Sequence, residues 1–362
     1  MRLEELDFDV PEGSIAQRPA EPRDSCRLMY LDAQGSAHHG RFFDLPLYLK
    51  PGDALVLNDS LVLPARLQAV KPTGGGVELL FLRPVDGRPP KTGEVWEVLA
   101  RPSHRLRPGT ELTVAGTQRL TLRELLGEGR WLAEGPAGSS MVAVMDAHGT
   151  LPLPPYIKTY PDDPSSYQTV YAAAPGSAAA PTAGLHFTPA LLERLRRSGV
   201  RSAFVTLHVG LDTFQPIREP VVEEHRIHRE TYSVSQTAVE TIRSTVQSGG
   251  RLVAVGTTAA RVLETLAARG VVTGSGGAGA TTGSTEIFMT PGYRFQAVHA
   301  LLTNFHLPRS TVLALVMAFA GIERVRRAYA EAIDRGYRFF SFGDAMLIDA
   351  PVAEETDGRR SG

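Results

Sequence analysis

Three histidines stand at the ends of expected secondary-structure elements, among polar neighbours. His186 precedes an expected helix, His208 lies near the exit of an expected strand over residues 202–210, and His306 follows an expected strand over residues 299–305. Because imidazole takes up and releases a proton near neutral pH, histidines at the ends of rigid elements suit general acid–base catalysis. The alternative, that His186 and His208 only pack or hydrogen-bond inside the core, stays open on spacing alone.

The elements that must position these histidines carry their own signals. Thr188 and Pro189 are typical of a helix start. The threonine oxygen can accept one of the unpaired N–H groups of the first turn, and proline suits the first helical position because it has no backbone N–H. Leucines on one face continue this helix to Arg197, and Gly199 ends it. The apolar run that follows is typical of a buried strand, so the pattern predicts a rigid scaffold between the first two histidines.

Polar residues follow three expected strands, and sheet-based sites are commonly assembled at such ends. The three polar turns are Asn58-Asp59, Gly256-Thr257-Thr258 and Thr303-Asn304-Phe305-His306. The second turn leads into an expected helix over residues 259–268, which would direct N–H groups and the positive helix end toward an anion or a polar ligand. This turn lacks the full glycine pattern of a phosphate-binding loop, so the motif alone is weak.

Other segments complete the expected α/β domain. Arg18, Arg23 and Asp24 lie between prolines, which indicates either a rigid loop that presents charge or a solvated turn. Residues 274–284, rich in Gly, Ser, Thr and Ala, predict a flexible loop. Beyond them we expect a helix capped by Ser310, a helix over 323–335, and a closing strand over 338–342 that leads to Asp344.

The pattern of expected secondary structure changes between residues 67 and 150, where short β-like runs alternate with Gly/Pro turns. The runs cover residues 77–82, 95–99, 111–114, 119–122 and 131–133. Regular short strands with turn signals predict a small antiparallel barrel or sandwich. We therefore expect an α/β main domain over 1–66 and 151–352, an inserted β-barrel domain over 67–150 and a disordered tail over 353–362. The insertion carries a basic cluster, Arg101, His104, Arg105 and Arg107, that indicates a solvated face or phosphate contact.

Composition limits the class of protein. The chain has 362 residues with a formal net charge of −1, so no global basic field indicates a nucleic-acid partner, although a local patch can serve. Its single cysteine, Cys26, excludes an internal disulfide framework. The N-terminus lacks a signal-peptide pattern, and the most apolar segment, 312–320, is too short to span a bilayer. We expect a cytoplasmic protein without a membrane partner.

The chain resembles the S-adenosylmethionine:tRNA ribosyltransferase-isomerase family of queuosine biosynthesis in short sequence blocks spread over nearly its whole length. The blocks are Ile15-Ala16-Gln17-Arg18-Pro19, Glu21-Pro22-Arg23-Asp24, Asn58-Asp59, Pro64-Ala65-Arg66, Pro155-Tyr156-Ile157, Tyr167-Gln168-Thr169-Val170-Tyr171, residues 180–187, Leu207-His208-Val209-Gly210, Gly256-Thr257-Thr258, Glu286-Ile287-Phe288, Pro291-Gly292-Tyr293, residues 302–308 and residues 339–346. The run over residues 274–284 departs from the family pattern, being longer and lower in complexity.

The resemblance implies that S-adenosylmethionine is consumed as a ribosyl donor. Its ribosyl part is transferred and rearranged onto 7-aminomethyl-7-deazaguanine at the wobble position of a tRNA with a GUN-type anticodon. Epoxyqueuosine-tRNA forms, and adenine and methionine leave. The resemblance also implies a monomer, the expected mixed α/β domain with its inserted barrel, and no cofactor or metal, since S-adenosylmethionine is a substrate.

The resemblance also indicates the site residues. His186, His208 and His306 are the candidates for proton transfer, and which of them serves as base or acid stays open. A sulfonium cation is stabilised by a carboxylate or an aromatic face, for which Asp59, Asp344 and Tyr171 are candidates. The full set of expected substrate-binding residues is Arg18, Arg23, Asp24, Asn58, Asp59, Arg66, Tyr171, Thr182, Gly256, Thr257, Thr258, Glu286, Thr303, Asn304 and Asp344.

Two alternatives come from other classes of function. His225 and His228, with Glu286, His186 or His208, predict a metal site and hence a metal-dependent hydrolase. The same histidines equally fit a charged surface stretch. The barrel could instead serve a non-catalytic RNA-binding protein.

Overall fold

The computed structural model describes residues 1–362 except 86–92, 211–215, 228, 275–278 and 352–362. The chain divides into two compact units, here called the sheet unit and the barrel unit. The sheet unit comprises Met1–Asn58, Thr182–Val205 and Gln215–Gly362, and the barrel unit comprises Asp59–Pro181 and Thr206–Phe214. The predicted fold class, a mixed α/β fold with an antiparallel barrel, is confirmed. The predicted tail over 353–362 lies outside the described residues.

The barrel unit is larger than the insertion expected over residues 67–150. It also contains the segments on either side of the barrel, up to Pro181, and the separate piece Thr206–Phe214. The barrel strands themselves run from Arg66 to Glu134. The boundaries 1–66, 67–150 and 151–352 therefore stay a prediction about independent domains.

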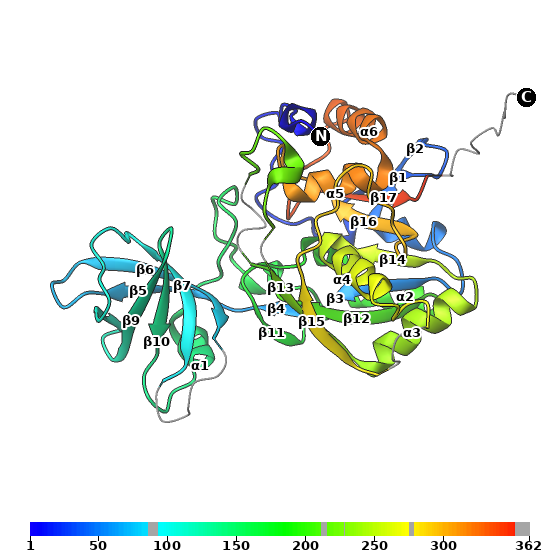
Figure 1. Ribbon diagram of the computed structural model, residues 1–362. Coiled ribbons are helices and arrows are strands. Elements are labelled where there is room, and N and C mark those ends of the chain that lie inside the picture. The colour runs from blue at the N-terminus through cyan, green and yellow to red at the C-terminus, as the bar shows by residue number, and fades with distance from the viewer. Residues whose placement is uncertain (86–92, 211–215, 228, 275–278, 352–362) are drawn as a thin grey trace, which may run out of the picture. The chain divides into compact units, whose positions relative to one another are not determined.

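A nine-stranded mixed sheet forms the centre of the sheet unit (Figure 1). In spatial order its strands are β15 (Thr281–Thr285), β13 (Glu230–Val234), β12 (Arg201–Leu207), β3 (Ala54–Asn58), β14 (Leu252–Val255), β16 (Ala300–Asn304), β17 (Ala345–Asp349), β1 (Arg27–Leu31) and β2 (Ala37–Arg41). Strands β12, β3, β14 and β16 are parallel, whereas β17 is antiparallel to β16 and parallel to β1. Every residue of β3, β14 and β16 is buried, as expected for strands covered on both faces.

Helices and short 3-10 turns connect these strands. They are η1 (Leu3–Leu6), η2 (Arg23–Ser25), η3 (Phe42–Leu47), η5 (Thr182–His186), α2 (Pro189–Arg197), η7 (Val222–Glu224), α3 (Gln236–Gln247), α4 (Gly256–Ala268), α5 (Thr311–Ala320) and α6 (Ile322–Asp334). The predicted caps are confirmed, since the Thr188 hydroxyl accepts the Leu191 N–H at 3.1 Å and the Ser310 hydroxyl accepts the Leu313 N–H at 3.2 Å. Within the described ranges, no helix combines the length and apolarity needed to cross a membrane.

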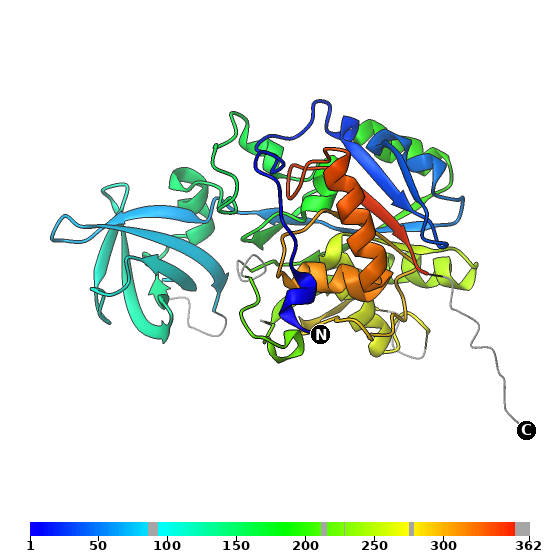
Figure 2. The same cartoon turned by 90° about the horizontal axis from the view of Figure 1, so that it is seen from above.

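The N-terminal segment lies against the C-terminal helices, as Figure 2 shows. Arg326 on α6 donates to the Glu5 carbonyl at 3.1 Å, and Arg309, just before α5, pairs with Asp7. The N-terminal segment is thereby held against α6 and the loop before α5.

The helix expected over residues 259–268 is confirmed, but its start and two other expectations about this unit need correction. Helix α4 begins at Gly256, not at residue 259, because a glycine with φ of +85° allows the chain to turn directly from β14 into the helix. Residues 338–342 form no strand: Phe340 has φ of +68°, and the last strand is β17. The expected flexible loop over 274–284 ends in β15, which is rich in β-branched threonines and pairs antiparallel with β13. Residues 275–278 of that loop lie outside the described residues.

The barrel closes in the order β10, β7, β6, β5, β8, β9. Its strands are β5 (Arg66–Val70), β6 (Gly76–Pro84), β7 (Val95–Arg101), β8 (Glu111–Val114), β9 (Gln118–Gly127) and β10 (Arg130–Glu134). The core includes Trp131, Phe81 and Trp96, all 4% exposed or less. Strand β5 and helix α1 (Met141–His148), whose buried methionines join this core, were not predicted from the sequence. The unit also holds β4 (Ser60–Val62), η4 (Pro164–Tyr167) and β11 (Ala174–Ser177), with β4 and β11 paired in parallel.

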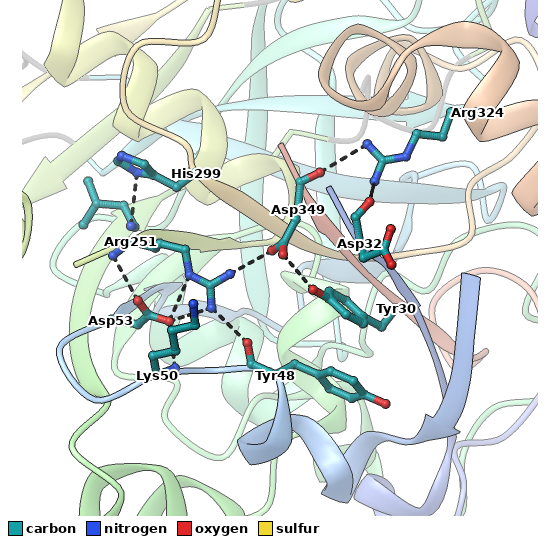
Figure 3. Close-up of polar contacts among 10 residues, drawn as sticks. Tyr30, Asp32, Tyr48, Lys50, Asp53, Arg251, His299, Arg324 and Asp349 are labelled. Carbon is teal, nitrogen blue, oxygen red and sulfur yellow. Dashed lines mark hydrogen bonds and ion pairs between the residues drawn. The ribbon is translucent and has the colours of Figure 1, made fainter. Parts of the chain in front are cut away.

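Ionic contacts around Arg251 tie together the edge of the sheet where β3 and β14 begin (Figure 3). Its guanidinium donates to Asp53 at 2.7 Å and 3.1 Å and to Asp349, at the end of β17, at 2.9 Å. Asp349 also accepts the Tyr30 hydroxyl at 2.7 Å. Although burial opposes ionisation, hydrogen bonds from Arg251 and from backbone N–H groups hold the pKa of Asp53 below its usual value. This network therefore fixes the strand starts, opposite to the edge where the polar turns lie.

Candidate active site

Three of the predicted site residues come together in the barrel unit. Asp59, which directly follows β3, accepts a hydrogen bond of 2.6 Å from the Thr206 hydroxyl. Burial and then the charge of Asp59 raise the pKa of Tyr171, and the same charge opposes the lowering of the pKa of His208 by burial. A carboxylate that interacts electrostatically with a phenol and an imidazole forms, together with them, a set capable of proton transfer beside a cation. We call Asp59, Tyr171, Thr206 and His208 the Asp59 cluster.

The imidazole of His208 is held by close packing. A Cβ at Gly176, whose φ is +135°, would lie 2.9 Å from Cε1 and 3.1 Å from Nδ1 of the ring. Only a residue without a side chain leaves this space. The ring therefore lies directly on the Gly176 backbone in β11.

Burial lowers the pKa of His208, and Asp59 offsets part of this shift. The ring is consequently neutral at pH 7. Its buried Nδ1 has no hydrogen-bond partner among the described residues. A neutral imidazole with a ring nitrogen that makes no hydrogen bond within the described residues can act as a general base.

His186, at the end of η5 in the sheet unit, is in a different situation. Its side chain is 4% exposed, with Nε2 2.9 Å from the Asn304 amide nitrogen and Nδ1 3.4 Å from Cys26 Sγ. The Asn304 nitrogen also donates to the Phe340 carbonyl, while its oxygen accepts the Thr182 hydroxyl at 3.0 Å. Because the amide nitrogen can only donate, Nε2 of His186 accepts and the ring proton resides on Nδ1, toward the sulfur.

This arrangement makes His186 a neutral core histidine. Burial, followed by the charges of Arg338 and Arg23, lowers its pKa to about 3. Burial likewise raises the pKa of Cys26, and the charge of Asp344 adds to that effect. Both ring nitrogens are engaged within the fold, so the geometry fits hydrogen bonding inside the core, the alternative that the sequence left open. A catalytic role of His186 stays a prediction.

His306 is held on the other face of β16. Its Nε2 lies 2.8 Å from the Thr303 hydroxyl, and its backbone N–H donates to the Tyr329 hydroxyl at 2.9 Å. Consecutive residues of a strand point to opposite faces, so Thr303 and Asn304 hold the two histidines apart. Burial lowers the pKa of His306 to about 4, although the residue keeps partial exposure.

The predicted turn at the start of α4 is a second candidate binding feature, and it lies in the sheet unit. Gly256 lies against η5, since a Cβ there would be 3.6 Å from that of Ala183. Thr257 and Thr258 are 8% and 9% exposed, and the Thr258 hydroxyl has no hydrogen-bond partner within the described residues. The first N–H groups of a helix are unpaired, so this turn suits an anionic or polar group of a substrate.

Two predicted carboxylates of the sheet unit bind the protein's own chain. Asp344 is 2% exposed and accepts the N–H groups of Arg27 at 2.8 Å and of Arg338 at 2.7 Å. Asp24 accepts the Thr188 hydroxyl at 2.8 Å and so orients the cap of α2. Both carboxylates position loops at the edge of the sheet where β3, β14 and β16 end.

The chain matches the family model described as queuosine biosynthesis protein over residues 3–348. It is 53% identical to the S-adenosylmethionine:tRNA ribosyltransferase-isomerase of Rubrobacter xylanophilus over 96% of this chain and 98% of that one. The Moorella thermoacetica protein of the same name is 48% identical over 96% and 100% of the two chains. The crystal structure of the S-adenosylmethionine tRNA ribosyltransferase from Thermotoga maritima, 37% identical, superposes with a TM-score of 0.54 over 95% of this chain and 99% of that one.

The chain belongs to the queuosine biosynthesis protein family. The resemblance drawn from the sequence is thereby confirmed.

Four further residues expected from the family pattern lie at other positions in the fold. Arg18 is exposed, Arg23 acts on His186 through its charge, and Asn58 is fully buried at the end of β3. Arg66 starts the barrel and pairs with Glu78 at 3.7 Å. Their substrate-binding roles stay predictions for this family member.

The residues of the alternative metal site are paired with other groups. The Glu286 carboxylate pairs with Arg229 at 2.9 Å, and His225 Nδ1 lies 2.8 Å from Glu219. His228 lies outside the described residues. In the part of the chain that is described, no three His, Cys, Asp or Glu side chains are grouped as metal ligands.

Sequence reasoning missed two residues that shape the site of this family member. Thr206 lies two residues before His208, so the period of a strand places both on one face, and that signal was available. Gly176 carries no signal apart from being glycine, because its contact with the His208 ring joins segments 32 residues apart (208 − 176).

Proposed function

We propose that this protein is an S-adenosylmethionine:tRNA ribosyltransferase-isomerase. It transfers and isomerises the ribosyl part of S-adenosylmethionine onto 7-aminomethyl-7-deazaguanine at the tRNA wobble position. The products are epoxyqueuosine-tRNA, adenine and methionine. The observation that carries the proposal is the family match over residues 3–348, together with relatives of this name that are about half identical over nearly their full length.

The Asp59 cluster supplies groups for the chemistry. The reaction requires loss of a proton from the carbon beside the sulfonium, and we assign this step to the neutral His208 ring. Asp59, held by Thr206, places negative charge where a sulfonium cation is stabilised. Tyr171, whose pKa is raised by burial and by Asp59, stays protonated and can donate a hydrogen bond.

We further propose that the substrate is a tRNA with a GUN-type anticodon and that the protein acts as a cytoplasmic monomer. No cofactor is needed, because the sulfonium of S-adenosylmethionine itself activates the ribosyl group. Turnover should therefore persist in strong chelators. Loss of turnover on chelation that one added metal restores would contradict this part of the proposal.

The direct test is incubation of the purified protein with S-adenosylmethionine and precursor-modified tRNA, followed by measurement of released adenine. Unmodified tRNA is the substrate control, because it lacks the attacking amine. His208→Gln should lower the rate by about two to four orders of magnitude, as loss of a general base does. Asp59→Asn should also lower the rate, because it removes the negative charge placed for the sulfonium. His148→Gln, an exposed histidine of the same unit, is the matched control and should leave it unchanged. Binding of tRNA without adenine release by the wild type would overturn the proposed function.

A further inference from the structure

An open pocket of about 450 Å³ in the sheet unit has a positively charged lining. It is lined by Arg27, His39, Gly40, Arg41, Arg335 and Tyr337. Arg27 begins β1, Arg41 ends β2 and Arg335 follows α6, so three separate elements contribute one arginine each. We call this site the arginine pocket.

The register of the sheet places the arginine pocket at a defined edge. The start of β17, Ala345, pairs with Asn304 at the carboxyl end of β16, and Leu28 of β1 pairs with Ala345. Arg27 in turn pairs with Arg41. The pocket therefore lies at the same edge of the sheet as the end of β16 and the polar turn of α4, where substrate residues are expected.

Two of the three guanidinium groups have spare hydrogen-bond donors. Arg27 donates to the Arg335 carbonyl at 2.6 Å and stacks over the Tyr337 ring at 5.3 Å, and Arg41 donates to the Ser25 carbonyl at 2.9 Å. A guanidinium has five N–H donors, so each keeps several for a ligand. Within the described ranges neither group is paired with a carboxylate.

The nearby negative charge is already shared. Glu331 accepts a contact of 2.9 Å from His39 Nε2 and another of 2.9 Å from Arg335. Two further carboxylates lie close by and are engaged with the backbone: Asp44 accepts the Arg41 N–H at 2.9 Å, and Asp344 accepts the Arg27 N–H at 2.8 Å. The three arginines line the pocket, and none of these three carboxylates does. An open site lined by guanidinium groups and by no carboxylate fits a phosphate group, since guanidinium binds phosphate through paired hydrogen bonds.

We propose that the arginine pocket binds a backbone phosphate of the tRNA substrate. This inference rests on the proposed function, which supplies the polyanion. The chain as a whole carries a net charge of −1, so a local pocket must provide the attraction for RNA. Arg41 also holds the carbonyl of Ser25, next to Asp24, and thus links the pocket to the loop that caps α2.

The test is tRNA binding by the full-length protein at several salt concentrations, with no turnover required. Arg41→Gln and the double variant Arg41→Gln/Arg335→Gln each remove pocket charge. Each lost phosphate contact should reduce the magnitude of the slope of the log association constant against log salt concentration by about 0.7–0.9. For affinities that converge at high salt, this slope change makes the variant bind tRNA about fivefold to eightfold more weakly at a tenfold lower salt concentration.

Arg201→Gln is the matched control. Arg201 is also an exposed arginine at a strand end, and its guanidinium contacts the Ser244 hydroxyl at 3.2 Å, but it begins β12 at the opposite edge of the sheet. This variant should bind tRNA as the wild type does. Melting temperatures of all variants show whether the fold is intact.

Variants that bind tRNA with wild-type affinity and slope would overturn the inference. It would also fail if the wild type bound inorganic phosphate in this pocket while the variants lost only that binding and kept their tRNA affinity. Release of adenine by the wild type is measured separately. A protein that binds tRNA through these arginines but releases no adenine refutes the proposed function and leaves the pocket assignment standing.

Discussion

Replacing Gly176 by alanine tests the placement of His208 without touching any reacting group. The added Cβ would lie 2.9 Å from Cε1 of the ring, whereas ordinary contacts begin near 3.4 Å. The ring must therefore withdraw by about 0.5 Å (3.4 − 2.9). A displacement of 1 Å at a reacting group can cost about a hundredfold in rate, so half of that predicts about a tenfold loss.

The substitution also strains the backbone, because φ of +135° disfavours any residue with a side chain. That strain costs about 1–3 kcal/mol of stability and must be separated from the effect on the ring. Gly74→Ala is the matched control: Gly74 has φ of +85° in the same unit and nothing within 4 Å of the added Cβ.

Adenine release at saturating substrates and thermal melting are measured for both variants. We expect both to melt earlier and only Gly176→Ala to lose rate per folded molecule. If Gly176→Ala turned over as fast as Gly74→Ala, the position of the His208 ring would be irrelevant to the reaction and our assignment of the base would be refuted.

Three other perturbations follow from the buried polar groups. His186→Ala should lower the unfolding free energy by about 1–3 kcal/mol, because the Asn304 amide nitrogen loses one of its two acceptors. Adenine release per folded molecule should change far less than on loss of a general base, and a stable variant without turnover would restore His186 to the proton-transfer step. The pKa of His186, about 3 in the fold against 6.5 ordinarily, means that its stability contribution is complete above pH 6.5 and is lost as the pH falls toward 3, by up to about 1.4 kcal/mol per pH unit. Denaturant unfolding at pH 7 and pH 5 measures this slope, which should be shallower in His186→Asn. Arg251→Met should cost about 3–5 kcal/mol, since Asp53 is left buried without its cation, and a loss below about 1 kcal/mol in chemical unfolding would show that the network is dispensable.

Local signals in the sequence predicted local structure well. The caps Thr188 and Ser310 were readable because an N-cap depends on residues within one turn. The strand expected over residues 338–342 was wrong because the positive φ of Phe340 has no signature in a run of apolar residues. Helix α1 was missed because its eight residues are mostly apolar and show no clear stripe.

The candidate site was predicted only where strand ends mark it. Asp59 and His208 each follow a strand, and the structure places them in one cluster. The environment of His186 could not be predicted, because its partners Asn304 and Cys26 are 118 and 160 residues away in the chain. Whether a histidine is free or hydrogen-bonded on both nitrogens depends on such long-range contacts, which no local pattern encodes.

The position of β17 between β16 and β1 has a consequence for synthesis on the ribosome. The hairpin β1–β2 is made early, but the strand that joins it to the sheet begins 304 residues after the end of the hairpin (345 − 41). At about 5–20 residues per second, the hairpin waits on the order of 15–60 s for its neighbour, and an isolated hairpin is at best marginally stable in water. Arg27 and Arg41 are therefore among the first residues translated and among the last to reach their final surroundings, so a nascent chain gains its arginine pocket only when translation is almost complete.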